Sequence, residues 1–190
     1  MKILLDANVI FTFLSRREDK YLKETDVIIH DCINKRIDGF VAFHSLSIVW
    51  YLLRHNPLDL RLRWMKLICT SLKIANADNE TVLRALDRND FPDFEDNLQD
   101  CCARQAQVDY IVTANIKDYS GRSLIPAITP LELLRLLESE NNNDESWIAE
   151  NNQDEVRESN SSYQISKHIA LAHNHVIRMS EQRCVVAFIA

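Results

Sequence analysis

Glycine is scarce in this sequence: only Gly39 and Gly121 occur among its 190 residues. Neither of the common phosphate-binding loops, G-x-G-x-x-G and G-x-x-x-x-G-K-[ST], can be formed from them, because both loops need glycines at fixed short spacings. The sequence therefore excludes nucleotide-binding enzymes of the P-loop and dinucleotide types.

Paired cysteines and long apolar runs are also missing. The five cysteines are odd in number and form no C-x-x-C pair, which argues against a zinc ribbon and against a disulfide framework. We expect free, buried thiols in a reducing compartment. The apolar start ends at Asp6 and no run is long enough to cross a bilayer, so the sequence predicts neither a signal peptide nor a membrane span and favours a cytoplasmic location.

The negative charge is concentrated in one stretch. The net charge is −6, but residues 138–160 hold eight acidic residues and a single arginine, whereas 1–137 are nearly neutral. This stretch is rich in Asn, Asp, Glu and Ser and has few bulky apolar residues, a composition typical of disorder. We predict a domain over 1–137, an acidic disordered linker over 138–160 and a C-terminal segment of unknown role over 161–190. Because the acidity belongs to the linker, it does not exclude a nucleic-acid partner for the domain.

Short apolar runs alternate with helical patterns along the predicted domain. The expected strands cover 2–6, 39–42, 73–75, 109–113 and 125–128. The expected helices cover 8–15, 22–36, 45–54, 56–72, 79–88, 91–107 and 129–137. Asn56 is expected to cap a helix with Pro57 in its first position, and Thr129 and Glu132 form a capping-box pattern. This alternation predicts an α/β fold with a central, mainly parallel sheet flanked by helices.

Carboxylates and one amide are expected at the carboxyl edge of that sheet, where the sites of α/β proteins gather. Asp6 ends the first strand, and Asn115 and Asp118 follow the strand that ends at Thr113. Asp93 can cap a helix and Asp96 then falls in its first turn, where the helix dipole favours a negative charge. Carboxylates without neighbouring histidine or cysteine suit a hard cation such as Mg²⁺ or Mn²⁺.

Each of these residues also has an ordinary structural explanation. Asp6 and Asp93 would serve as helix caps, Glu95 as a solvated helix position, and Asn115 and Asp118 as turn residues. Only the combination of all of them points to a metal site.

Three segments of the sequence form a recognisable set. They are Lys2-Ile-Leu-Leu-Asp6-Ala-Asn8-Val-Ile10, Asp93-Phe-Glu-Asp96-Asn-Leu-Gln99 and Asp109-Tyr-Ile-Val-Thr113-Ala-Asn115-Ile-Lys-Asp118-Tyr119. Together they resemble the PIN-domain family, nearest to the VapC-type toxins of bacterial toxin–antitoxin pairs, and the likeness extends through 125–134. The resemblance implies a PIN-like three-layer fold. It also implies a Mg²⁺- or Mn²⁺-dependent ribonuclease acting on RNA, with a cognate antitoxin protein as partner and a homodimer as an option.

The family pattern assigns roles by position. Asp6 matches its first acid, Asp96 the third, Asn115 the place of a fourth acid in many members, and Asp118 an acid that often follows; Thr113 matches a hydroxyl residue of the family. The resemblance thus implies Asp6, Asp96, Asn115 and Asp118 as catalytic residues and Asp6, Asp93, Asp96 and Asp118 as metal ligands. The second acid is missing: Ile48 stands near its expected place, and 45–54 contain no carboxylate.

Positive charges that could bind the RNA backbone form two groups. They are Arg16, Arg17 and Lys20, and Arg54, Arg61, Arg63 and Lys66. For each group the alternative interpretation is that these charges simply cover a solvent-exposed helix face and bind no RNA.

Two other functions compete with a ribonuclease. Because the second acid is lost and Asn115 replaces another, the domain could be catalytically weakened and act as an RNA- or antitoxin-binding module. A phosphatase of the haloacid-dehalogenase type would need a second aspartate where Asn8 stands.

Overall fold

The computed structural model describes residues 1–91 and 93–139. Its strands are β1 (Lys2–Leu5), β2 (Asp38–Ala42), β3 (Lys73–Ala75), β4 (Tyr110–Val112) and β5 (Ala127–Ile128). Its helices are α1 (Ala7–Ser15), α2 (Leu22–Ile33), α3 (Phe43–Leu52), α4 (Leu58–Ser71), α5 (Asn79–Asp87), α6 (Phe94–Ala106), the short 3₁₀ helix η1 (Ile116–Asp118) and a last helix over 130–139.

The five strands form one sheet in the order β3-β2-β1-β4-β5. All four strand pairs are parallel, with Ile3 opposite Gly39 on one side and opposite Tyr110 on the other. The predicted α/β class with a parallel central sheet is confirmed. Because the strands are parallel, Asp6 after β1 and Thr113 after β4 come out at the same edge.

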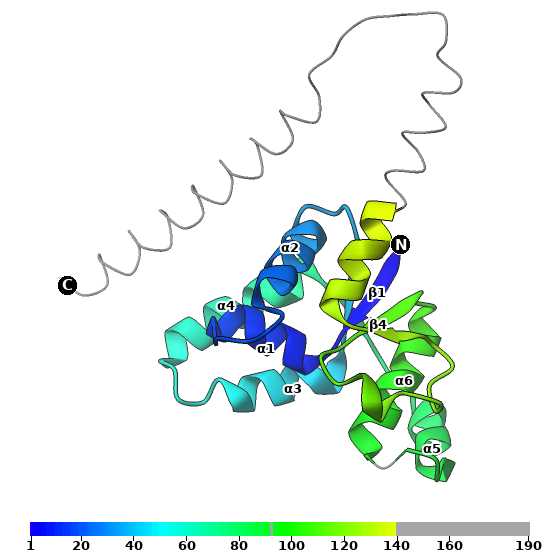
Figure 1. The fold of residues 1–190 in the computed structure, drawn as a ribbon. Helices are drawn as coiled ribbons and strands as arrows, with labels where there is room; N and C mark the ends of the chain where they lie inside the picture. Colours follow the sequence, from blue (N-terminus) through cyan, green and yellow to red (C-terminus); the bar gives the residue numbers. More distant parts are fainter. Residues whose placement is uncertain (92, 140–190) are drawn as a thin grey trace, which may run out of the picture. The chain divides into compact units, whose positions relative to one another are not determined.

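Helices cover both faces of the sheet (Figure 1). On one face Ile3 and Leu5 pack with α1 to α4 and with Leu133 of the last helix. On the other face Leu4 and Ile111 pack against α6. Alternate residues of β1 thus enter opposite cores, as expected for a strand buried on both sides, and the three-layer arrangement is confirmed.

Gly39 is required by close packing. A Cβ atom at this position of β2 would lie 2.6 Å from Cys32 Sγ and 2.6 Å from Leu72 Cδ2. Any larger residue would push α2 and the end of α4 away from the sheet.

The predicted helices are present, but several ends differ from the prediction by two or three residues: the helix expected over 22–36 ends at Ile33, and that expected over 91–107 begins at Phe94. Thr129 and Glu132 form the predicted capping box, with Glu132 N–H donating to Thr129 Oγ1 at 3.1 Å and Thr129 N–H donating to Glu132 Oε2 at 2.7 Å. The prediction that Asn56 caps α4 is wrong. Asn56 Nδ2 donates back to the Leu53 carbonyl at 3.2 Å, and Pro57 itself occupies the N-cap position.

The predicted linker over 138–160 and the segment over 161–190 lie almost wholly outside the described residues; the last helix continues to 139. The described cysteines are free, and Cys32, Cys101 and Cys102 are buried as expected, whereas Cys69 is exposed. Among the described residues, the helices are too short or too polar to cross a membrane.

Candidate functional site

A groove of about 440 Å³ lies at the carboxyl edge of β1 and β4. All the acidic and amide residues predicted for the site line it, namely Asp6, Asp93, Asp96, Asn115 and Asp118. Asp19 and Glu95 line it too, which makes six carboxyl groups against one cation, Arg17. The groove is therefore strongly acidic.

Asp6 is held by its neighbours rather than used as a helix cap. It occupies the N-cap position of α1, but its side chain makes no capping hydrogen bond. Instead its Oδ2 accepts hydrogen bonds from Thr113 Oγ1 at 2.7 Å and from Asn8 Nδ2 at 2.6 Å. Burial raises the pKa of Asp6, and the hydrogen bond from Thr113 lowers it in part. The residue is 7% exposed, so a carboxylate here is held in one orientation within a poorly solvated site.

Asn8 and Thr113 also join the ends of the two central strands. Asn8 Oδ1 accepts from the Ala114 amide at 3.2 Å, and Thr113 Oγ1 accepts from the Asn115 amide at 3.0 Å. The same two side chains that hold Asp6 thus fix the start of the segment that carries Asn115. The sequence pattern contained Asn8 but gave no sign of this role.

The first turn of α6 supplies three more carboxyl groups. Asp93 is the N-cap and accepts from the Glu95 amide at 2.8 Å, so the capping explanation holds for it while it also lines the groove. Asp96 is the third residue of α6, still within its first turn, and is less exposed than Asp93. Burial, followed by the charges of Asp6, Asp118 and Asp93, raises the pKa of Asp96 to about 6.

Glu95 is exposed on α6, as expected for a solvated helix position. Its side chain also borders the groove. Burial raises its pKa, and the nearby charges of Asp6, Asp93 and Asp96 add to the effect. Glu95 is thus one of the mutually repelling acids.

A buried hydrogen-bond chain supports Asp96 from behind. Ser45 Oγ donates to Gln99 Oε1 at 2.9 Å, Gln99 Nε2 donates to Tyr119 Oη at 2.8 Å, and Tyr119 Oη donates to Asp96 Oδ1 at 3.1 Å. Burial and the charges of Asp6 and Asp96 raise the pKa of Tyr119, so its phenol stays protonated and remains a donor. Sequence reasoning missed Ser45, Gln99 and Tyr119. The spacing of Asp96 and Gln99, three residues apart on one helix, was the available signal for one of them.

Asn115 and Asp118 form a local pair at the other side of the groove. Asn115 Nδ2 donates to Asp118 Oδ2 across the single turn of η1. Asn115 is exposed and Asp118 is half-buried. The pair explains the turn at this point, and both side chains still border the groove.

The helices α1 and α3 add apolar side chains to the lining of the groove. These are Phe11, Ile48 and Leu52, beside the polar Asn8 and Thr12 of α1. Ile48 therefore borders the groove at the place expected for the missing second acid. An acid there would add a seventh carboxyl group to the groove.

Of the predicted cations, only Arg17 lines the groove among the described residues. Arg16 is paired with Asp26, and Arg63 with Asp59 at 2.9 Å. Arg61 stacks on Trp50, with its Cζ 3.7 Å from the ring centroid. The second basic group is thus partly engaged in contacts within α4 and between α4 and α3.

The donor set fits a hard divalent cation in its chemistry. All six acidic side chains offer carboxylate oxygens. The pKa values of Asp96 and Glu95 are raised first by burial and then by the charges of neighbouring acids, and a bound cation would offset the second effect. Within residues 1–91 and 93–139, however, no three His, Cys, Asp or Glu side chains lie close enough together to hold a metal ion between them. Mg²⁺ commonly binds through one or two carboxylates and keeps several waters, so this arrangement suits it better than a fully protein-coordinated ion.

Comparison with known sequences decides the family. The sequence model of the PIN domain matches residues 2–117. The chain belongs to the PIN-domain family. The match covers β1 and the following Asp6, the first turn of α6, and β4 and the following loop with Asn115, so the predicted resemblance is confirmed.

Two solved structures with TM-scores above 0.5 share this fold. A toxin–antitoxin complex from Klebsiella pneumoniae is similar with a TM-score of 0.53 and 16% identity, over 67% of this PIN-domain chain and 97% of the other. VapBC2 from Rickettsia felis, bound to a DNA fragment of its promoter, is similar with a TM-score of 0.52 and 13% identity; the match covers 68% of this chain and 98% of the other. VapC20 from Mycobacterium tuberculosis, a toxin that cleaves the sarcin–ricin loop, has a TM-score of 0.47 and 14% identity; the match covers 63% of this chain and 91% of the other. No curated protein sequence matches the chain significantly.

Proposed function

We propose that this PIN-domain protein is a divalent-metal-dependent ribonuclease and the toxin of a toxin–antitoxin pair. The observation that carries the proposal is the buried carboxylate of Asp6, oriented by Thr113 and Asn8, beside Asp96 in a groove with six carboxyl groups. So many acids at one place cost stability unless a cation binds among them.

Asp6 and Asp96 are the proposed direct ligands, and Asp93 and Asp118 would contribute through bound water. A Mg²⁺ or Mn²⁺ ion held there would supply a more acidic, oriented water molecule and stabilise charge on the scissile phosphate. Asn8 and Thr113 keep the Asp6 carboxylate in place, and Tyr119 does the same for Asp96 by donating a hydrogen bond to it at 3.1 Å. Asn115 restrains Asp118.

RNA must approach an acidic groove, so its phosphates need cations nearby. Arg17, at the rim of the groove, is the proposed contact for the phosphate backbone. The apolar side chains of Phe11, Ile48 and Leu52 offer a surface against which an unpaired base can pack.

An antitoxin protein is the proposed partner. The two similar structures with TM-scores above 0.5 are described as toxin–antitoxin assemblies. This chain exposes apolar side chains on two neighbouring helices, namely Phe43 and Tyr51 on α3 and Leu58 and Leu62 on α4. Such a surface is suited to bind an amphipathic segment of another protein.

Cleavage of labelled RNA by the full chain tests the proposal. We expect cleavage with Mg²⁺ or Mn²⁺ and none with EDTA. Asp6→Asn should lower the rate at least about a hundredfold, because even indirect partners of a metal site cost roughly 10–100-fold when removed. Asp59→Asn is the matched control, since Asp59 lies on α4 with a side chain 73% exposed.

A second candidate function follows from Ile48. The groove carries an isoleucine where an acid is expected, and this favours a weakened domain that binds RNA or antitoxin without cleaving. In the same assay this module would retain labelled RNA on a filter, with equal retention by Asp6→Asn, and would release no cleavage product under any metal condition.

A further inference from the structure

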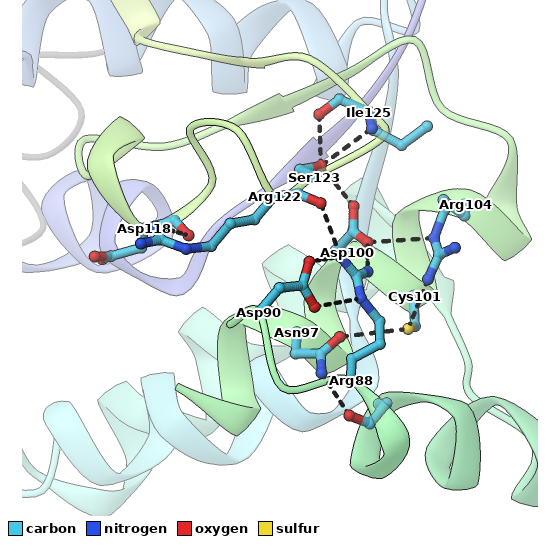
Figure 2. Close-up of polar contacts among 11 residues, drawn as sticks. Arg88, Asp90, Asn97, Asp100, Cys101, Arg104, Asp118, Arg122, Ser123 and Ile125 are labelled. Atoms are coloured by element: carbon cyan, nitrogen blue, oxygen red, sulfur yellow. Dashed lines mark hydrogen bonds and ion pairs between the residues drawn. The ribbon is translucent and has the colours of Figure 1, made fainter. Parts of the chain in front are cut away.

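A buried carboxylate outside the groove, that of Asp100, connects Arg88 after α5 with Ser123 before β5 (Figure 2). Asp100 lies on α6, one turn after Asp96, and is 0% exposed. Its Oδ2 lies 2.7 Å from Arg88 Nη1 and 3.2 Å from Arg104 Nε, and its Oδ1 accepts from Ser123 Oγ at 2.5 Å. Both oxygens of this buried charge are therefore satisfied by residues from three parts of the chain.

Arg88 is the centre of the cluster. Besides Asp100, its guanidinium binds Asp90 through Nε at 3.1 Å and Nη2 at 2.8 Å, and it donates to the Arg122 carbonyl at 2.8 Å. It also lies over the ring of Phe91, 4.6 Å from the centroid. Only a planar group with several fixed donors can make these contacts at once, so lysine would not replace it.

The cluster also binds the segment 116–123, which carries Asp118, through hydrogen bonds to Arg122 and Ser123. Arg88 binds the Arg122 carbonyl, and Arg122 Nη1 in turn donates to the Lys117 carbonyl at 3.0 Å, one residue before Asp118. Ser123 ties the far end of the same segment to α6 through Asp100. The backbone around Asp118 is thus fixed to the helix that carries Asp96.

A second connection runs through aromatic rings. Phe91, under the Arg88 guanidinium, packs edge-on against Tyr119 with centroids 6.2 Å apart. Tyr119 then donates to Asp96. Both connections begin at Arg88 and end at carboxylates of the groove.

The energetics of buried charge argue for a role beyond stability. Burying ion pairs carries a desolvation cost that well-packed apolar side chains avoid, often without loss of stability. An apolar cluster would not supply directional contacts, whereas the hydrogen bonds of Arg88, Asp100 and Ser123 fix one arrangement of the chain around Arg88 and of the segment 116–123.

We propose that Arg88, Asp100 and Ser123 form a clasp that positions the segment 116–123 against α6, so that Asp118 and Tyr119 meet Asp96 at the groove. Arg88 and Asp100 are positioning residues. The purpose of this positioning rests on the proposed function, but the hold on the segment can be measured without metal or RNA.

Hydrogen exchange of the metal-free full chain is the first test. The amides of Tyr119, Ser120, Arg122 and Ser123 donate to carbonyls within the segment. In Arg88→Met we expect these four amides to exchange about tenfold faster or more, since local opening becomes easier when charge-assisted hydrogen bonds are lost. The amide of Asp6, which donates to the Val112 carbonyl at 3.0 Å in the central sheet, should be unaffected.

Arg84→Met is the matched control. Arg84 lies on α5, its side chain is 55% exposed, and it pairs with Glu80 at 2.8 Å. Its replacement removes the same guanidinium without touching the clasp, so exchange of the segment should not change.

Mn²⁺ affinity of the folded variants is the second readout. We expect Arg88→Met to bind Mn²⁺ several-fold more weakly than wild type. The affinity of Arg88→Lys should lie between those of the two proteins, because lysine restores the positive charge but not the planar set of hydrogen-bond donors. Should Arg88→Met fail to fold, Ser123→Ala removes the loop side of the clasp more gently and should shift both readouts the same way.

Three results would overturn the proposal: unchanged exchange in the segment, equal acceleration in the central sheet, or faster exchange of the segment with unaltered Mn²⁺ affinity. If wild type itself binds no Mn²⁺, the proposed metal site fails. The exchange data then still decide whether the clasp holds the segment.

Discussion

Replacing Asp96 by asparagine should stabilise the metal-free protein. The pKa of Asp96 is raised from 3.8 to about 6, first by burial and then by the charges of Asp6, Asp118 and Asp93. A carboxyl group with a raised pKa binds its proton more tightly in the folded state, so its ionisation opposes folding. Asparagine keeps an oxygen that can accept the hydrogen bond from Tyr119 but carries no charge.

The size of the effect follows from the shift. A change of about two pKa units corresponds to roughly 3 kcal/mol of unfolding free energy. Because Asp96 is only half-buried, solvent screening reduces this, and we expect a gain of about 1 kcal/mol. Ionised Asp96 lowers the free energy of unfolding of the wild-type protein. This loss is absent below pH 4, grows as the pH rises from about 4 to 6, and is complete above about pH 6.

Urea unfolding in EDTA at pH 4 and pH 8 measures this gain. Asp96→Asn and wild type should be equally stable at pH 4, and the variant should be more stable at pH 8; Asp59→Asn, exposed on α4, provides the control. Saturating Mg²⁺ should reverse the order at pH 8, because the cation stabilises the protein that binds it better. A variant that is less stable than wild type at pH 8 in EDTA would refute the reasoning.

Two further predictions concern the surroundings of the same carboxylates. Ile48→Glu should weaken the metal-free fold by adding a carboxyl group to the groove and should raise Mn²⁺ affinity in a titration; unaltered or weaker affinity would show that position 48 does not reach the cation. Thr113→Val should lower the unfolding free energy by about 1–3 kcal/mol, because it leaves buried Asp6 with one hydrogen bond fewer, and equal urea midpoints would contradict this.

The strand edge was predictable because parallel topology fixes it. Once β1 and β4 were expected as buried parallel strands, Asp6 and Asn115 had to come out at one edge, and Asp93 and Asp96 followed from the rules of helix capping. The failure at Asn56 is local: its amide turned back to Leu53, an option that asparagine side chains also have in turns.

The hydrogen bonds and ion pairs that hold the acidic residues of the groove in place could not be predicted from one sequence. Ser45 and Gln99 are 54 residues apart, and their contact depends on how α3 and α6 pack. Arg88 likewise looks like an ordinary charge after a helix until the fold brings Asp100 and Ser123 to it. Such partners are set by tertiary packing, which no local pattern encodes.

The central claim is that Asp6 and Asp96 bind one divalent cation in the groove. Paramagnetic Mn²⁺ added to the isotope-labelled full chain tests it most directly, because it broadens the amide signals nearest to the bound ion. In wild type the signals of Ala7, Asn97 and Asn115 should broaden at low Mn²⁺ concentration, and in Asp6→Asn they should persist at concentrations at least about tenfold higher. Equal broadening in both proteins, or broadening confined to residues away from the groove, would contradict the account.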